Sequence, residues 1–94
     1  MIHYGTNETW AWHPDTEEVR FTVWDDERYR EIECRVTREC ISDHCGNPSG
    51  PDACFTAAKE HFDPITDLVG HYIGGGRFEP DGSILLRTDD WPST

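Results

Sequence analysis

Two stretches of alternating apolar and polar residues predict a β-hairpin in the first half of the chain. Residues 19–24 alternate in this way, and residues 30–36 repeat the alternation around Cys34. Because successive side chains of a strand point to opposite faces, each stretch is typical of a strand with one buried face. The Asp-Asp-Glu-Arg sequence between them has no glycine. We therefore expect an antiparallel hairpin over residues 19–36 with a loop of four or five residues.

The apolar spacing becomes helical after the hairpin. Thr37 is suited to cap a helix because its hydroxyl can accept a hydrogen bond from a first-turn amide, and Gly46 is typical of a helix end. Residues 37–46 are therefore a predicted short helix. Residues 52–73 place apolar side chains every three or four positions, which predicts a longer amphipathic helix. Pro64 interrupts this stripe, so the long helix is either kinked there or split into two abutting helices.

The two ends of the chain have less regular patterns. Residues 1–18 are expected to form an aromatic and acidic arm, with a short edge strand and an irregular segment that closes over the core. A Glu-Pro-Asp-Gly turn precedes a final predicted strand at residues 83–88, which we expect to pair with the hairpin. These elements predict one α+β domain over residues 1–94. In it, two or three helices pack on one face of a small antiparallel sheet of three or four strands.

The composition is consistent with a small domain that has a modest core. Hydrophobic residues make up 35% of the 94 residues, but four Trp, four Phe and three Tyr bury large areas. No apolar run approaches the roughly 20 residues of a membrane helix, and the first residues lack the basic-then-apolar pattern of a signal peptide. We therefore expect a cytoplasmic location and reduced cysteines.

The charge is strongly acidic. The chain has 19 Asp and Glu against 8 Lys and Arg, which gives a formal net charge of −11. Such a surface repels nucleic acid and anionic lipid and attracts basic proteins, so we expect no direct binding to nucleic acid or membrane. The alternative is that the charge serves only solubility.

Two separate sequence signatures resemble a known family. The first runs from the strand around Cys34 to the Asp-His-Cys-Gly sequence that ends the short helix, and the second is GRFEPDGSILL at residues 76–86. In this order they resemble the small bacterial family catalogued as domain of unknown function 1488, over about residues 19–90. This chain departs from the family pattern at Cys45, where the family usually has phenylalanine. The resemblance implies an α+β fold of a small antiparallel sheet against helices, and it implies no activity.

A metal site is the sharpest chemical hypothesis in the sequence. Cys40 and His44 are about one helical turn apart, and Cys45 and Cys54 would complete a tetrahedral set of zinc ligands. However, the sequence has no Cys-x-x-Cys pair, and cysteine often packs in a core as a small apolar residue. We therefore predict no metal and no cofactor. A Cys/His metal-binding or redox-sensing cluster remains the alternative function, and a Cys45–Cys54 disulfide is expected only on oxidation.

No catalytic arrangement is readable in the chain. Asp43 and His44 are an acid–base pair, but no nucleophile stands at a recognisable spacing from them. The three glycines before Arg77 lack the lysine and the following helix of a phosphate-binding loop. We therefore expect no enzymatic activity.

The functional hypothesis that remains is an acidic partner-binding surface. Three runs of carboxylates are expected to converge on one side of the hairpin, with an exposed tryptophan as the anchor. The predicted partner-binding residues are Asp15, Glu17, Glu18, Trp24, Asp25, Asp26, Glu27, Glu31 and Glu33. Rows of carboxylates resemble the phosphates of a duplex. The expected partner is therefore a basic protein surface that normally binds nucleic acid, as for phage-encoded inhibitors of bacterial defence such as anti-CRISPR proteins.

Overall fold

The computed structural model describes residues 1–46 and 48–87. In chain order the elements are β1 (Ile2–His3), a 3-10 turn (Asn7–Thr9), β2 (Ala11–His13), β3 (Glu18–Asp25), β4 (Arg30–Thr37), α1 (Arg38–His44), α2 (Pro51–Glu60), α3 (Phe62–Gly74) and β5 (Ile84–Leu86). The predicted α+β class is confirmed. The sheet in this part of the chain has five strands rather than the three or four expected.

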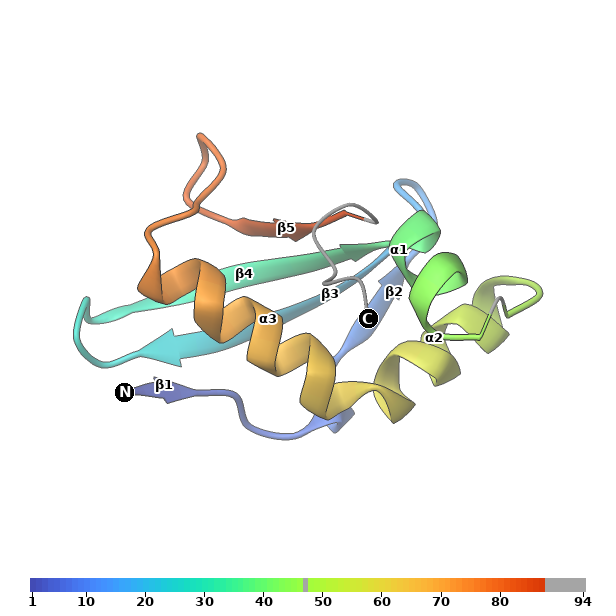
Figure 1. Cartoon of the computed structure of the whole chain (residues 1–94), viewed down its shortest axis with the longest axis horizontal. Helices are drawn as coiled ribbons and strands as arrows, with labels where there is room; N and C mark the ends of the chain where they lie inside the picture. Colours follow the sequence, from blue (N-terminus) through green and yellow to red (C-terminus); the bar gives the residue numbers. More distant parts are fainter. Residues whose placement is uncertain (47, 88–94) are drawn as a thin grey trace.

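The hairpin of β3 and β4 is the centre of the sheet (Figure 1). The two strands pair antiparallel along their whole length and are joined by a four-residue turn, as predicted. Short strands β1 and β2 pair with opposite ends of β3, whereas β5 pairs with β4 in parallel. The sheet is therefore mixed and not purely antiparallel. The helices between β4 and β5 return the chain to its starting end, and such a crossover produces a parallel pair.

All three helices pack on one face of the sheet, and Figure 1 shows α3 crossing in front of β3 and β4. The sheet contributes alternate residues to this interface, and each is at most 3% exposed: Val19, Phe21, Val23, Ile32, Cys34, Val36, Ile84 and Leu86. The facing side of α3 contributes Ile65, Val69 and Ile73. Full burial of one aliphatic side chain is worth about 1.5–3 kcal/mol, so this single layer supplies most of the driving force for folding.

Pro64 splits the predicted long helix, although the break lies three residues before it. Helix α2 ends at Glu60 and α3 begins at Phe62, with His61 as the cap of both. Proline has no amide hydrogen, and its ring would clash with the carbonyl of the residue four positions earlier, here Glu60. A continuous helix is therefore interrupted at His61. The alternative of two abutting helices is the one observed.

The predicted edge strand in the N-terminal arm is confirmed as β1, and the predicted cap of α1 is confirmed as well. The Thr37 hydroxyl accepts a hydrogen bond from the Cys40 amide at 3.2 Å.

The segment expected to be irregular forms strand β2 instead. Trp10, just before β2, is buried and stacks on Phe21 with ring centroids 4.2 Å apart. Strand β5 is shorter than the predicted 83–88, and residue 88 lies outside the described residues. None of the described helices is both long and apolar enough to cross a lipid bilayer.

Candidate partner-binding surface

The face of the sheet opposite the helices carries the candidate site, and we call it the open face. It consists of the residues of β3 and β4 that alternate with the core: Arg20, Thr22, Trp24, Glu31, Glu33 and Arg35. No described helix covers this face. Trp24 is 38% exposed there, which is unusual for a side chain that contributes so much apolar area.

Strand register places Trp24 among polar neighbours. Glu31 of β4 lies directly opposite it on one side, and His3 of β1 lies opposite it on the other. Thr22 and Glu33 form the next cross-strand pair on the same face. Directly opposed side chains have Cβ atoms about 4.5–5.5 Å apart, so Trp24 and the two glutamates form one contiguous patch. The structure thus brings together three of the residues that the sequence singled out.

The other half of the open face is basic. Arg20 and Arg35 are directly opposed in the register of β3 and β4. The Arg20 Nε donates to Glu18 at 2.5 Å, and the same nitrogen lies 3.8 Å from the Glu33 carboxylate. The Arg35 Nη2 donates to the Ser83 hydroxyl at 3.1 Å. The open face therefore has an acidic, aromatic end near the hairpin turn and a basic end, rather than continuous rows of carboxylates.

The predicted convergence of three acidic runs is wrong. The run at residues 15–18 leads into β3, and the run at residues 25–27 follows from its end. Strand β3 has eight residues, and at 3.3 Å per residue its ends are about 23 Å apart. Only the second run lies at the same end of the hairpin as Glu31. An extended strand between the two runs keeps them apart.

Two of the carboxylates predicted to bind a partner are buried. Glu18 is 5% exposed and pairs with Arg20, while Asp25 has no exposed surface. Glu17 is exposed but forms an ion pair with Arg38 at 3.2 Å. The prediction that Glu18 and Asp25 contact a partner is therefore corrected, because both carboxylates are used inside the fold.

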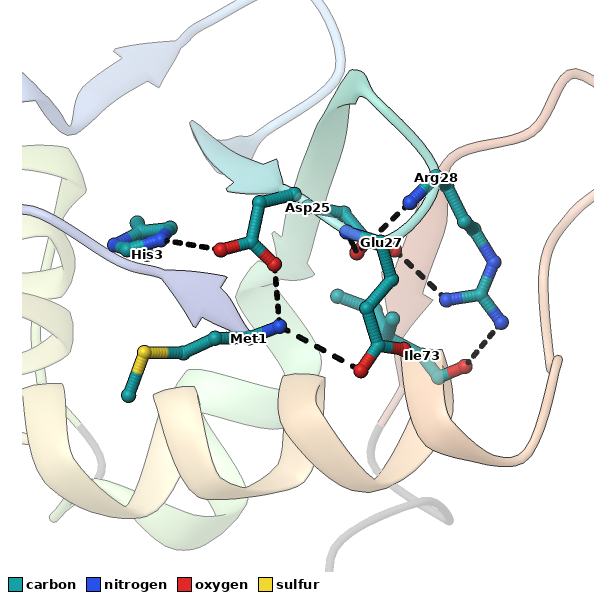
Figure 2. A network of polar contacts seen from close by, with 7 residues as sticks. Met1, His3, Asp25, Glu27, Arg28 and Ile73 are labelled. Carbon is teal, nitrogen blue, oxygen red and sulfur yellow. Dashed lines mark hydrogen bonds and ion pairs between the residues drawn. The ribbon is translucent and has the colours of Figure 1, made fainter.

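Asp25 organises the hairpin turn (Figure 2). Its carboxylate accepts hydrogen bonds from the backbone amides of Glu27 and Arg28, at 3.0 and 3.4 Å, and from Arg28 Nη1 at 2.7 Å. The same guanidinium donates through Nη2 to the carbonyl of Ile73 near the end of α3, at 3.3 Å. The Arg28 side chain, followed by the two backbone amides, lowers the pKa of Asp25. Asp25 and Arg28 thus connect the hairpin turn to the helix layer.

Asp26 is also engaged within the molecule. One of its oxygens contacts the amino group of Met1, and the other lies 3.0 Å from His3 Nε2. The hydrogen bonds from Met1 and then from His3 lower the pKa of Asp26. Glu27 is 78% exposed and lies 3.6 Å from the same amino group. Of this acidic run, Glu27 is the member that projects furthest into solvent.

Tyr29 was missed by the sequence reasoning. It is the last residue of the hairpin turn, and it is 82% exposed. Its ring lies 6.1 Å from that of Trp24, with an angle of 84° between the ring planes. Its backbone has φ = +57°, a left-handed conformation. Hairpin turns commonly require one residue with a left-handed backbone, and glycine usually fills that position. The absence of glycine from this turn therefore indicated that a residue such as Tyr29 must adopt that conformation.

The cysteines pack in the core. Cys34, Cys40, Cys45 and Cys54 are all buried and free of disulfides, so the Cys45–Cys54 bridge is not formed. Within the described residues, no three side chains of His, Cys, Asp or Glu are placed to hold a metal ion. The alternative cluster of His44 with Cys40, Cys45 and Cys54 is therefore not assembled as a ligand set among the described residues. Burial raises the pKa of Cys34 to about 12 and that of Cys45 to about 11, which keeps both thiols protonated.

The fold and surface define a small α+β protein in which three helices pack on one face of a mixed sheet and the other face is open. The chain matches the family model "Protein of unknown function (DUF1488)" over residues 6–86, and it belongs to this family. A crystal structure of a protein of unknown function from the same family, from Shewanella loihica PV-4, has a TM-score of 0.78 at 14% identity over 90% of each chain. No curated protein shows a significant match. The family resemblance seen in the sequence is thus confirmed, and the structural likeness supports the fold.

Proposed function

We propose that this protein is a non-enzymatic binding module that docks onto a basic protein surface through the acidic, aromatic end of its open face. The observation that carries the proposal is Trp24, which stays 38% exposed on an uncovered sheet face directly opposite Glu31. Tryptophan is enriched among the residues that dominate binding energy, and charges around such an anchor mainly steer association. Trp24 is therefore the anchor, and Glu27, Glu31 and Glu33 are the steering charges.

The hollows of the surface support a protein partner better than a small-molecule ligand. One hollow of about 560 Å³ lies between the turn before β3 and the start of α1. Its lining consists of hydroxyl-bearing and charged residues: Thr16, Glu17, Thr37, Arg38, Glu39, Ser42 and Asp43. Small-molecule sites are usually lined by apolar and aromatic side chains with a few polar groups. Binding through the exposed sheet face is the better-supported mode.

A pair of double charge reversals tests the docking surface. Glu31→Lys/Glu33→Lys changes the open face, while the control Glu39→Lys/Glu60→Lys makes the same charge change at exposed positions on the helices. With a short arginine-rich peptide as the probe, we expect the open-face variant to bind at least about tenfold more weakly. The control should change affinity less than about threefold. Binding is measured by fluorescence anisotropy, and circular dichroism checks folding.

The dependence of peptide affinity on salt concentration is a second test of the same surface. Wild-type affinity should fall as salt is raised from about 0.1 M to about 1 M, where the Debye length shrinks from about 10 Å to about 3 Å. Affinity that is flat across this range would show that the charge serves solubility alone. Equal weakening by both double variants would show that the peptide responds to the net charge and not to this face.

We propose further that the basic surface is one that normally binds nucleic acid, so that the module acts as a nucleic-acid-mimic inhibitor of the anti-CRISPR type. The support is the net charge of −11 together with the solvent-facing carboxylates of Glu27, Glu31 and Glu33. The test is displacement of labelled duplex DNA from a purified CRISPR effector complex, which the Glu31→Lys/Glu33→Lys variant should fail to achieve. Undisturbed DNA binding at excess wild-type protein would contradict this proposal but not the docking surface.

A further inference from the structure

We propose that Trp24 and Tyr29 form a two-sided aromatic site for one arginine side chain of the partner, with Glu31 as its counter-charge. The proposal rests on the docking function above and specifies the chemistry of its central contact. The two rings are nearly perpendicular, at 84°, with centroids 6.1 Å apart. A cation placed in the angle between them lies within the roughly 6 Å over which a ring attracts it, for both rings at once.

Trp24 and Tyr29 differ from several other aromatic rings among the described residues because no cation of that part of the chain lies over them. Among the described residues, three other aromatic rings are covered by a cation of the same chain: Arg28 and Arg30 lie over Phe78, Lys59 lies over Phe55, and Arg77 lies over Tyr72. The distances from cation to ring centroid are 4.4–5.5 Å. Within the described residues, no cation lies over Trp24 or Tyr29. The exposed rings of Trp24 and Tyr29 are therefore available to a cation of the partner protein.

The backbone of Tyr29 provides independent support. A bulky side chain is rarely found at a positive φ, where glycine or asparagine is the usual choice, yet Tyr29 has φ = +57°. Its side chain is 82% exposed, so little burial within the fold offsets this conformation. Backbone strain of this kind clusters at active sites and at sites that clamp a ligand. The phenol ring, which is mostly exposed at a position that favours glycine or asparagine, is therefore available for a contact outside the chain.

Glu31 supplies the charge that selects a cation. It is exposed, lies directly opposite Trp24, and makes no ion pair within the described part of the chain. The Glu27 carboxylate, two residues before Tyr29 in the turn, adds to the negative potential. A guanidinium fits better than an ammonium, because its flat surface stacks on a ring while its edge donates two parallel hydrogen bonds to one carboxylate.

Substitution of Tyr29 tests this site without damaging the fold. Tyr29→Asn removes the ring but favours the left-handed backbone, so thermal stability should be retained or increased. Tyr29→Phe keeps the ring and is the matched control. With the arginine-rich peptide, we expect Tyr29→Asn to weaken binding about fivefold or more and Tyr29→Phe less than about twofold. A matched lysine peptide should bind wild-type protein at least about threefold more weakly than the arginine peptide.

The outcomes separate this inference from the docking proposal. If the Glu31→Lys/Glu33→Lys variant loses binding while Tyr29→Asn does not, docking stands and the arginine site is overturned. Equal affinity for lysine and arginine peptides also overturns it. Failure of wild-type protein to bind the arginine peptide at low salt overturns both proposals. Loss of binding in Tyr29→Asn, with a shift of the Trp24 indole resonance on adding peptide to wild-type protein, supports the site.

Discussion

The carboxylates of this acidic protein have two distinct roles, and the role of each depends on whether it is buried or exposed. Asp25 is fully buried and accepts hydrogen bonds from two backbone amides and a guanidinium, whereas Glu31 is exposed on the sheet. A buried carboxylate is tolerated only when its oxygens are satisfied in this way. Asp25 therefore supports the hairpin turn, and Glu31 is left for contacts with a partner.

The first residue-scale prediction concerns Asp25→Asn. This substitution is expected to lower the free energy of unfolding, because asparagine has one acceptor oxygen where Asp25 has two. Its NH2 group must then face a donor, either Arg28 Nη1 or the turn amides. Asp15→Asn, at an exposed position, is the matched control and should change the value by less than about 0.5 kcal/mol. Urea denaturation at neutral pH measures both. Equal effects of the two substitutions would contradict the structural role of Asp25.

The dependence on pH follows from the direction of the pKa shift. Because the pKa of Asp25 is lowered in the folded state, its contribution to stability is present above its unfolded pKa, about 3.9. The contribution is lost as pH falls through the folded pKa. The stability gap between wild type and Asp25→Asn should therefore narrow as pH is lowered below about 4. Urea titrations at neutral and acidic pH measure the gap, and a constant gap would show that the charge of Asp25 does not matter.

At the scale of elements, the end of α3 illustrates how local chemistry determines where a helix stops. The Gly76 amide donates to Ile73 O at 3.1 Å and the Arg77 amide donates to Tyr72 O at 2.8 Å, the two bonds of a Schellman motif. The motif requires the left-handed backbone seen at Gly76, φ = +69°.

This geometry predicts opposite effects for two neighbouring glycines. Gly76→Ala should cost about 1 kcal/mol of unfolding free energy, because alanine is disfavoured at positive φ. Gly74→Ala places a methyl group in open space at the last helical position and should be neutral or stabilising by up to about 0.5 kcal/mol. Thermal unfolding of the two variants measures the contrast, and a similar loss in both would argue against the motif.

At the scale of the whole molecule, the three helices and the sheet bury all four cysteine side chains. Desolvation raises the pKa of Cys34 to about 12. At pH 8 only about one in ten thousand Cys34 side chains is therefore a thiolate. We therefore expect almost no reaction of the native protein with a thiol reagent at this pH. In denaturant all four thiols should react. Fewer than four reactive thiols in denaturant would instead favour the cysteine-based alternative function.

Much of the fold could be read from local patterns. The alternation around Cys34 predicted β4, Thr37 predicted the start of α1, and Pro64 predicted that the long helix is either kinked or split in two. These features depend on residues within a few positions of each other, such as a hydroxyl and the amide three residues on, or a proline and a carbonyl four residues before it. For the candidate site, the same alternation placed Trp24, Glu31 and Glu33 on one polar face.

Only the tertiary structure decided how distant segments meet. The parallel pairing of β5 and the contact of the Arg28 side chain with the carbonyl of Ile73 at the end of α3 both depend on how the chain returns after the helices. A carboxylate in the sequence carries the same charge whether it faces solvent or a guanidinium. Its role depends on desolvation and on partners that the fold brings in. The Arg28 guanidinium that binds Asp25 also donates to the carbonyl of Ile73, 45 residues further along the chain. The sequence thus determined the elements and their faces, and the packing between them determined which acidic residues were left for a partner.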